Sequence, residues 1–240
     1  MRGLRGRGIL RPLDGGSGRI QSERCDLEAV GAALACPEAT AAQILGQGRI
    51  RHYAPHVHIV RRGDRAATAY LVVIGRAQAL LYGFDGQLIL LHEFGPGDLF
   101  GALGGLGGVE EEADIVAAEA VRAFLLEAGV LVALAERHGA IGLALSRVLL
   151  KRLRATSVRM YERTALSAPG RVCAELARLA RAGRGTIRPA PIVAELALRA
   201  GTTRETASRT VNGLERRGII RRDADALTVV APGRLEGEIL

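Results

Sequence analysis

The chain has 240 residues, of which 48% are apolar, and its formal net charge is +8. This length and apolar content suit two modest domains or one large one, and the basic balance favours a polyanionic partner such as nucleic acid. Its three cysteines are too few and too scattered for a disulfide framework or a CxxC metal site. No apolar run is long enough to span a membrane, so we expect a cytoplasmic protein without a membrane segment.

The chain begins with MRGLRGRGILRPLDGGSGRI, which is rich in Gly and Arg. This stretch lacks the apolar core of a signal peptide. We interpret residues 1–24 as a flexible basic tail.

Short apolar runs separated by glycine turns fill the region from about Tyr53 to Leu126. The runs are YLVVIG, AQALLYG, QLILLHEFG and AFLLE, and the glycines that recur every 11 or 12 residues are Gly63, Gly75, Gly86 and Gly97. Such spacing is typical of an antiparallel barrel or jelly roll. RRGD and GPGD have the composition of paired corner turns. The sequence therefore predicts a β-roll domain over residues 25–132.

From about Leu131 to Thr164 the pattern changes to that of a long helix. Its apolar stripe is Leu145, Leu149, Leu153 and Met160, the first three at i+4 intervals. We assign residues 133–167 to one central helix. Such a helix between two domains either forms a dimer seam or packs on its own β-roll, and the sequence leaves both open. SAPGRVCAELARLAR then predicts a new helix that begins near Ala168.

A helix-turn-helix is predicted in the C-terminal region. PIVAELALRAG has a short apolar period, formed by Ile192, Leu196 and Ala200. Gly201 then supplies the turn, and Thr202 lies three residues before Glu205, which predicts a capping box at the start of a second helix.

The second helix has two distinct faces. The apolar face is Ala207, Val211 and Leu214, and the polar face is Glu205, Ser208, Arg209 and Asn212. In a helix-turn-helix this second helix enters the major groove, where Arg pairs with guanine and Glu accepts from cytosine N4. The alternative is a solvated surface helix in which Glu205 and Arg209 form only a local pair. Gly218, Ile219-Ile220 and Leu227 to Val230 then predict a β-hairpin wing with a turn at Asp223 to Asp225.

A β-roll, a long central helix and a winged helix-turn-helix, in this order, resemble the Crp/Fnr family of bacterial transcription regulators. The resemblance covers about residues 25–232, and its most specific piece is TTRETASR. It implies an α+β fold with an N-terminal antiparallel, jelly-roll-like β-roll, a long dimerisation helix and a winged helix-turn-helix over residues 168–240. It also implies a homodimer that binds an inverted repeat with a TGA…TCA core in double-stranded DNA and acts with RNA polymerase. The implied DNA-binding residues are Thr203, Arg204, Glu205, Ser208, Arg209 and Arg217, and the implied seam is Leu145, Leu149, Leu153 and Met160.

GPGDLFGALGGLGG is similar to the family's phosphate-binding turn. In cyclic-AMP-binding members the turn reads F-G-E-L and an R-S or R-T pair follows, whereas here Ala102 replaces the Glu, and Glu112 and Ala113 replace the pair. A carboxylate repels a phosphate and alanine donates no hydrogen bond, so we expect an unidentified effector other than cyclic AMP. The resemblance implies a pocket formed by His92, Gly101, Ala102, Leu103, Glu112, Ala113, Thr156 and Ser157.

Other cofactors and functions have weaker support in the sequence. Cys25 and Cys36 cannot supply the four thiolates that an iron–sulfur cluster usually needs. One alternative is a regulator that needs no ligand. Another is a cupin-like metal enzyme fused to a helix-turn-helix, because His56 and His58 would share one face of a strand. The arginines of HIVRRGD oppose a cation, and no catalytic set is visible, so we predict that the protein is not an enzyme.

Overall fold

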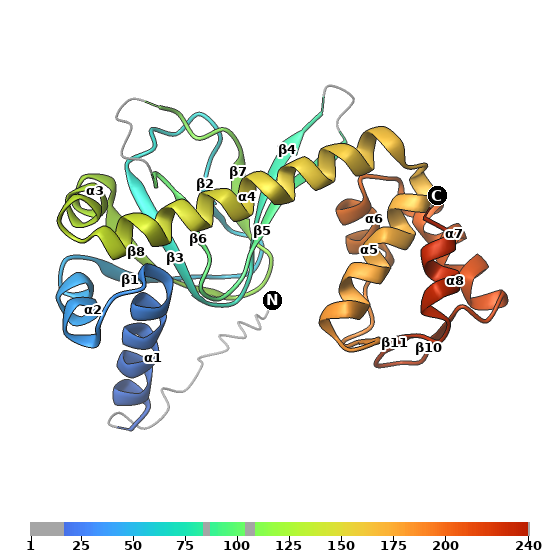
Figure 1. Cartoon of the computed structure of the whole chain (residues 1–240), viewed down its shortest axis with the longest axis horizontal. Helices are drawn as coiled ribbons and strands as arrows, with labels where there is room; N and C mark the ends of the chain where they lie inside the picture. Colours follow the sequence, from blue (N-terminus) through green and yellow to red (C-terminus); the bar gives the residue numbers. More distant parts are fainter. Residues whose placement is uncertain (1–16, 84–86, 104–108, 240) are drawn as a thin grey trace, which may run out of the picture.

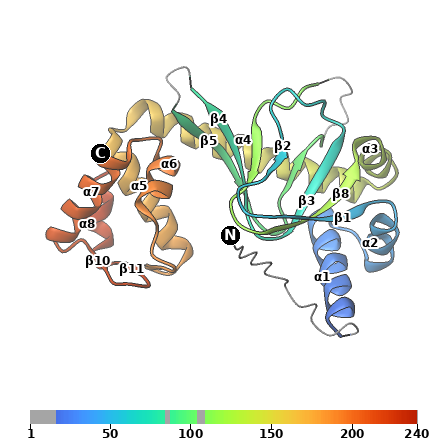
Figure 2. The same cartoon turned by 180° about the vertical axis from the view of Figure 1, so that it is seen from behind.

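A β-roll packs along the first part of a long helix, and a smaller domain lies at the far end of that helix (Figure 1). The computed structural model describes residues 17–83, 87–103 and 109–239. Three shorter helices, α1, α2 and α3, lie on one side of the roll, and Figure 2 gives the same arrangement from behind. The predicted α+β fold, a β-roll followed by a long helix and a winged helix-turn-helix, is confirmed.

Two antiparallel four-stranded sheets form the roll. After α1 (Ser17–Leu34) and α2 (Glu38–Leu45) come β1 (Arg49–Tyr53), β2 (His58–Val60), β3 (Thr68–Ile74), β4 (Ala77–Tyr82), β5 (Leu88–Phe94), β6 (Leu99–Gly101), β7 (Asp114–Ala117) and β8 (Val121–Glu127). The strand orders are β1-β8-β3-β6 and β2-β7-β4-β5. Most neighbouring strands are distant in the sequence, as in a jelly roll.

Strands β3 and β8 are apolar on both faces because both faces are covered. Leu71 and Val73 of β3 pack against helices, whereas Val72 between them packs between the two sheets. In β8, Phe124 joins the helix-covered core and Leu125 joins the core between the sheets. A strand buried on both faces reads as a continuous apolar run, which explains YLVVIG and AFLLE.

The turns predicted at RRGD and GPGD have matching hydrogen bonds. Asp64 Oδ2 accepts from the backbone N–H three residues earlier at 2.9 Å, and Asp98 Oδ2 accepts the equivalent bond at 3.0 Å. Gly63 and Gly97 have φ values of 83° and 86°, which glycine adopts without strain. The two turns are therefore a matched pair, as predicted, while Gly86 lies outside the described residues.

Helix α1 begins inside the segment 1–24 that was expected to be a tail. Residues 1–16 lie outside the described residues, but the helix starts at Ser17. A tertiary contact anchors it, since Asp26 accepts a 2.6 Å hydrogen bond from Arg122 of β8. A tail boundary at residue 24 is thus too late, because the anchoring partner is distant in the sequence.

The single helix predicted over 133–167 is in fact two helices. Helix α3 (Ala128–Arg137) and α4 (Gly139–Ala165) meet at His138, whose backbone is extended, and the two are bent by 119°. Apolar residues of both helices are buried in the same core, where one straight helix could not bring them. Within the described ranges no single helix is long and apolar enough to cross a membrane, and this bent pair passes that test only by combined length and composition.

The C-terminal domain starts with α5 (Ala168–Ala182), at the predicted place. Ser167 caps this helix by accepting a 3.1 Å hydrogen bond from Gly170 N. The elements that follow are β9 (Thr186–Ile187), α6 (Val193–Ala200), α7 (Arg204–Arg216), β10 (Ile220–Arg222), β11 (Leu227–Val229) and α8 (Pro232–Gly237). Strands β10 and β11 form the predicted wing hairpin, and β9, which the sequence analysis missed, pairs with β11.

Candidate nucleic-acid interface and effector cavity

The predicted capping box makes Thr202 the N-cap of helix α7, but the helix begins one residue later. Its N-cap is Thr203, whose Oγ1 accepts a 3.2 Å hydrogen bond from Thr206 N. The box predicted between Thr202 and Glu205 is therefore wrong in register, because Thr206 occupies the position where a box needs Glu or Gln. Glu205 is exposed instead.

The two predicted faces of α7 are present. The buried face is Ala207, Val211 and Leu214, all 0–2% exposed. On the other face Glu205, Arg209 and Asn212 are exposed and Ser208 is half-buried. Arg209 has no ion-pair partner in the described part of the chain, so no such intramolecular pair must break before it contacts a base. In the preceding helix Leu196 and Ala200 are buried as expected, but Ile192 is 63% exposed because it precedes the first turn of α6.

A residue that the sequence analysis did not single out holds the turn between α6 and α7. Arg171 of α5 donates hydrogen bonds to the carbonyls of Ala200 at 2.8 Å, Gly201 at 3.0 Å and Leu166 at 3.1 Å. Gly201 has φ 58° and ψ 48°, the left-handed conformation that ends α6. Arg171 thus ties the end of α4 to the turn that orients α7, and no local sequence signal marks this role.

The four arginines near the wing, Arg216, Arg217, Arg221 and Arg222, fall into two groups. Arg217 donates to Glu238 at 2.8 Å, and Arg222 Nε donates to Glu215 at 3.0 Å. A second nitrogen of Arg222 donates to Asn212 at 2.9 Å, so the wing also holds a side chain of the polar face of α7. The other two, Arg216 and Arg221, are exposed and have no ion-pair partner among the described residues.

A cavity of about 280 Å³ lies in the β-roll beside α4. Six of the eight predicted pocket residues line it: His92, Gly101, Ala102, Leu103, Glu112 and Ala113. Thr156 of α4 approaches His92, with 3.3 Å between Oγ1 and Nε2. Ser157 lies on the exposed side of α4 and donates to Leu153 O at 2.9 Å. Residues 104–108 of the glycine-rich stretch lie outside the described residues.

His92 and Arg152 form the basic side of the cavity. Burial lowers the pKa of His92, and the positive charges of Arg152 and Arg159 lower it further, so the imidazole is neutral at pH 7. The Arg152 guanidinium lies 5.0 Å from the centre of the Phe94 ring. Its Nη2 is buried and has no hydrogen-bond partner in the described residues. An unpaired buried donor is costly, so this group favours a ligand that brings an acceptor.

Glu110, Glu111 and Glu112 form the acidic side of the same cavity. Burial raises the pKa of Glu111, and the carboxylates of Asp64 and Glu112 raise it further. The rest of the lining is mostly apolar, with Phe94 and Phe100 among its members. The cavity therefore suits a small ligand with an apolar body and one acceptor, and the acidic side disfavours a phosphate.

Comparison with known proteins bears on both sites. The family model described as a cyclic nucleotide-binding domain matches residues 50–138, and the Crp-like helix-turn-helix domain matches residues 170–238. The chain is 32% identical over 175 residues to the cyclic AMP receptor protein of Thermus thermophilus, an alignment that covers 71% of this chain and 79% of that protein. The chain belongs to the Crp/Fnr family.

Two further comparisons agree with this membership. The CRP-like cAMP-activated global transcriptional regulator of Mycobacterium tuberculosis is 28% identical over 188 residues, which cover 75% of this Crp/Fnr chain and 84% of that protein. The solved structure of the c-di-GMP responsive global regulator CLP of Xanthomonas campestris has a TM-score of 0.71 at 21% identity. It covers 80% of this chain and 99% of the other, and shows the same fold.

The protein is therefore a Crp/Fnr transcription regulator, with a DNA-binding helix-turn-helix and an effector-binding β-roll. Such regulators are not enzymes, and they are typically dimeric.

The apolar stripe of α4 that was predicted to form the dimer seam is buried at one end and exposed along the rest. Leu145 is 7% exposed and packs in the core of its own domain, so its assignment to the seam is wrong. It lies on the side of α4 that faces the roll. The exposed apolar residues along α4 are Leu143, Leu149, Leu150, Leu153, Val158, Met160 and Tyr161, each 47–68% exposed.

The H-x-H motif does not build a metal site in this Crp/Fnr roll. His58 lies on β2, but His56 is in the preceding turn with φ 64°, so the two side chains do not share a strand face. No group of three His, Cys, Asp or Glu that could hold a metal is present in the ranges that the structure describes. Cys25 is exposed on α1, whereas Cys173 is buried in the packed face of α5.

Proposed function

We propose that this Crp/Fnr regulator binds an inverted-repeat operator as a homodimer. The observation that carries the proposal is the pairing of a buried apolar face and an exposed polar face on α7. Glu205 and Arg209 lie one helical turn apart, so both reach the same base pair. Arg209 pairs bidentately with guanine and Glu205 accepts from cytosine N4 on the opposite strand, within a TGA…TCA core. Two copies of α7 would enter successive major grooves about 34 Å apart.

The exposed apolar face of α4 supports the homodimer. Leu143, Leu150, Leu153 and Met160 are 47–68% exposed and follow one another at spacings of seven, three and seven residues, as positions along a coiled-coil seam do. A second copy of the same helix covers this face. Ser157 lies on the same face, while Thr156 contacts His92 of its own roll, so the seam runs beside the effector cavity.

A binding titration tests the DNA contacts. Arg209→Ala and Arg216→Ala are titrated against the palindrome and a scrambled duplex, each at two salt concentrations. Arg209→Ala should cost about 1–3 kcal/mol per half-site and relax the preference for its base pair. Arg216→Ala should weaken binding to both duplexes alike and lower the salt slope by about one unit. Equal weakening of both duplexes by Arg209→Ala would show that Arg209 contacts only the backbone.

For the β-roll we infer an effector other than cyclic AMP. Ala102, Glu112 and Ala113 stand where the resemblance expects the ribose-binding Glu, the phosphate-binding Arg and the hydroxyl. Arg152 meets an acceptor on the ligand, and Phe94 and Phe100 pack on its apolar body. Cyclic AMP is the second candidate, because two relatives bear it in their names.

Thermal unfolding with added ligands separates these effectors. The screen contains cyclic AMP, cyclic dinucleotides, haem and 2-oxoglutarate. A ligand that binds only the folded protein raises the unfolding temperature, whereas cyclic AMP should cause no shift at physiological concentration. A clear shift at micromolar cyclic AMP would contradict the inference, and a shift that disappears in Arg152→Gln would identify this guanidinium as the contact.

A further inference from the structure

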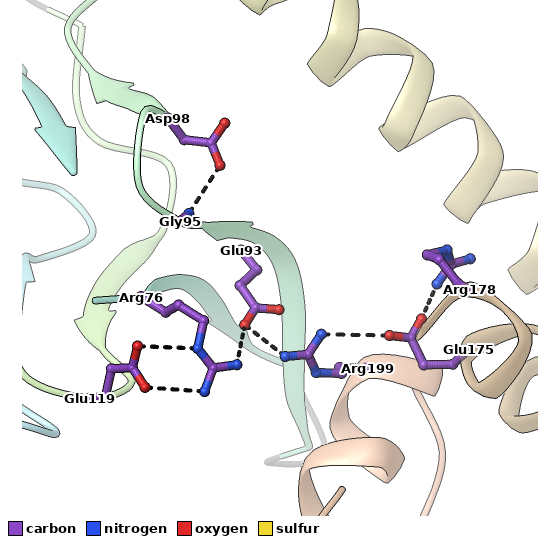
Figure 3. Close-up of polar contacts among 8 residues, drawn as sticks. All are labelled: Arg76, Glu93, Gly95, Asp98, Glu119, Glu175, Arg178 and Arg199. Atoms are coloured by element: carbon purple, nitrogen blue, oxygen red, sulfur yellow. Dashed lines mark hydrogen bonds and ion pairs between the residues drawn. The ribbon is translucent and has the colours of Figure 1, made fainter. Parts of the chain in front are cut away.

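A chain of ion pairs joins the β-roll to the DNA-binding domain (Figure 3). Glu93 of β5 accepts a hydrogen bond from Arg76 at 3.2 Å and another from Arg199 of α6 at 2.7 Å. Arg199 also lies 3.6 Å from Glu175 of α5. Glu119 extends the chain within the roll and Arg178 extends it within α5. We call these side chains the interdomain clasp: Arg76, Glu93, Glu119, Glu175, Arg178 and Arg199.

The charges at the centre of the clasp are shielded from water. The side chains of Glu93, Arg199 and Glu175 are 16%, 15% and 4% exposed. Removing one partner of such a pair leaves an uncompensated charge, so these three side chains are stable in the interface only while they are paired. By contrast, most surface ion pairs contribute little to stability and position nothing.

The clasp lies between the effector cavity and the turn that orients α7. Along β5, Ala79 pairs with His92 and Leu80 pairs with Leu90, so Leu91 is an extra, bulged residue. Leu91 and His92 both line the cavity, and Glu93 follows directly. At the other end Arg199 immediately precedes Ala200 in the last turn of α6, whose carbonyl Arg171 holds. Glu93 is thus adjacent in the chain to a residue of the effector cavity, and Arg199 is adjacent to a residue of the turn that orients α7.

We propose that Glu93 and Arg199 are positioning residues for DNA binding. The closed clasp fixes α6, and with it α7, relative to the roll, beside which α4 and its proposed dimer seam run. It does so without covering the polar face of α7, where Glu205 and Arg209 remain exposed. A dimer whose two α7 helices are already held at the spacing of two half-sites loses less conformational freedom when it binds. The inference rests on the proposed homodimeric binding to an inverted repeat.

The test compares Glu93→Gln with a matched control, Glu28→Gln. Both remove one carboxylate from an ion pair, but the Arg24–Glu28 pair is 79% and 68% exposed and lies outside the clasp. Affinity is measured for the palindrome, for a single half-site, and for a palindrome whose half-sites are separated by additional base pairs. Glu93→Gln should weaken binding to the palindrome about 10-fold, because the two domains must be ordered on binding, and leave half-site binding unchanged. It should also reduce the penalty for the altered spacing.

Amide hydrogen exchange gives a readout without DNA. Exchange in α6 and β5 should be faster in Glu93→Gln than in Glu28→Gln, because the clasp holds these elements together. Equal loss of palindrome and half-site affinity, tighter palindrome binding or unchanged exchange would each overturn the positioning role. If the unsubstituted protein shows no preference for the palindrome over a half-site, the proposed operator is wrong instead, and faster exchange in Glu93→Gln would still support the clasp.

Discussion

Replacing Arg171 by alanine should destabilise the C-terminal domain selectively. The guanidinium donates three hydrogen bonds, to the carbonyls of Ala200, Gly201 and Leu166, at 2.8 to 3.1 Å. A net contribution of about 0.5–1.5 kcal/mol for each bond gives a loss of about 1.5–4.5 kcal/mol. Because Arg171 is half-buried and water reaches some of the released carbonyls, the desolvation penalty adds little to this loss. Arg171→Lys keeps the charge but cannot make three bonds in this fork, so it should recover only part of the loss.

Hydrogen exchange of the amides in α6 and α7 measures this free energy locally. The control is Arg181→Ala, which removes an ion pair with Glu236 whose side chains are 73% and 56% exposed. That change should cost about 0–1 kcal/mol. DNA affinity should fall with Arg171→Ala, because the released turn no longer fixes α7. If Arg171→Ala costs no more than Arg181→Ala, the three bonds do not hold the turn and the reasoning fails.

Further predictions concern the dimer, the cavity and the buried thiol. Leu153→Asp should give monomers in sedimentation, whereas Leu145→Ala should cost about 2–5 kcal/mol of stability and leave the dimer intact; the opposite pattern would contradict the seam. Burial raises the pKa of Glu111 in the folded protein above its value in the unfolded chain. The folded protein is therefore destabilised at a pH above the folded-state pKa, where Glu111 is charged, and this destabilisation disappears at a pH below the unfolded-state pKa. Glu111→Gln should therefore raise the melting temperature at pH 7 but not near pH 4, and an equal shift at both would refute this cause. Burial raises the pKa of Cys173 to about 11, so a thiol reagent should modify Cys25 first in the folded protein, and early labelling of Cys173 would contradict its burial.

Local patterns in the sequence determined the elements of this protein and their order. Short apolar runs between recurring glycines such as Gly63 and Gly97 predicted the β-roll, and the period of Ala207, Val211 and Leu214 predicted the packed face of α7. These signals depend on interactions between near neighbours in the chain. They also predicted the wing, whereas the six residues that line the cavity were predicted only from the resemblance to the family.

Contacts between distant residues were decided only by the tertiary structure. Arg171 and the pair Glu93–Arg199 look like ordinary charged residues in the sequence, because their partners are 5 to 106 positions away. The bend at His138 and the burial of Leu145 have the same origin, since both follow from the shape of the core that α3 and α4 share. Helical periodicity shows which residues lie on one stripe, but it does not show whether that stripe packs on its own domain or on a second copy. In α4 the stripe packs on its own domain at Leu145 but is exposed at Leu153, because only part of the helix circumference touches the roll.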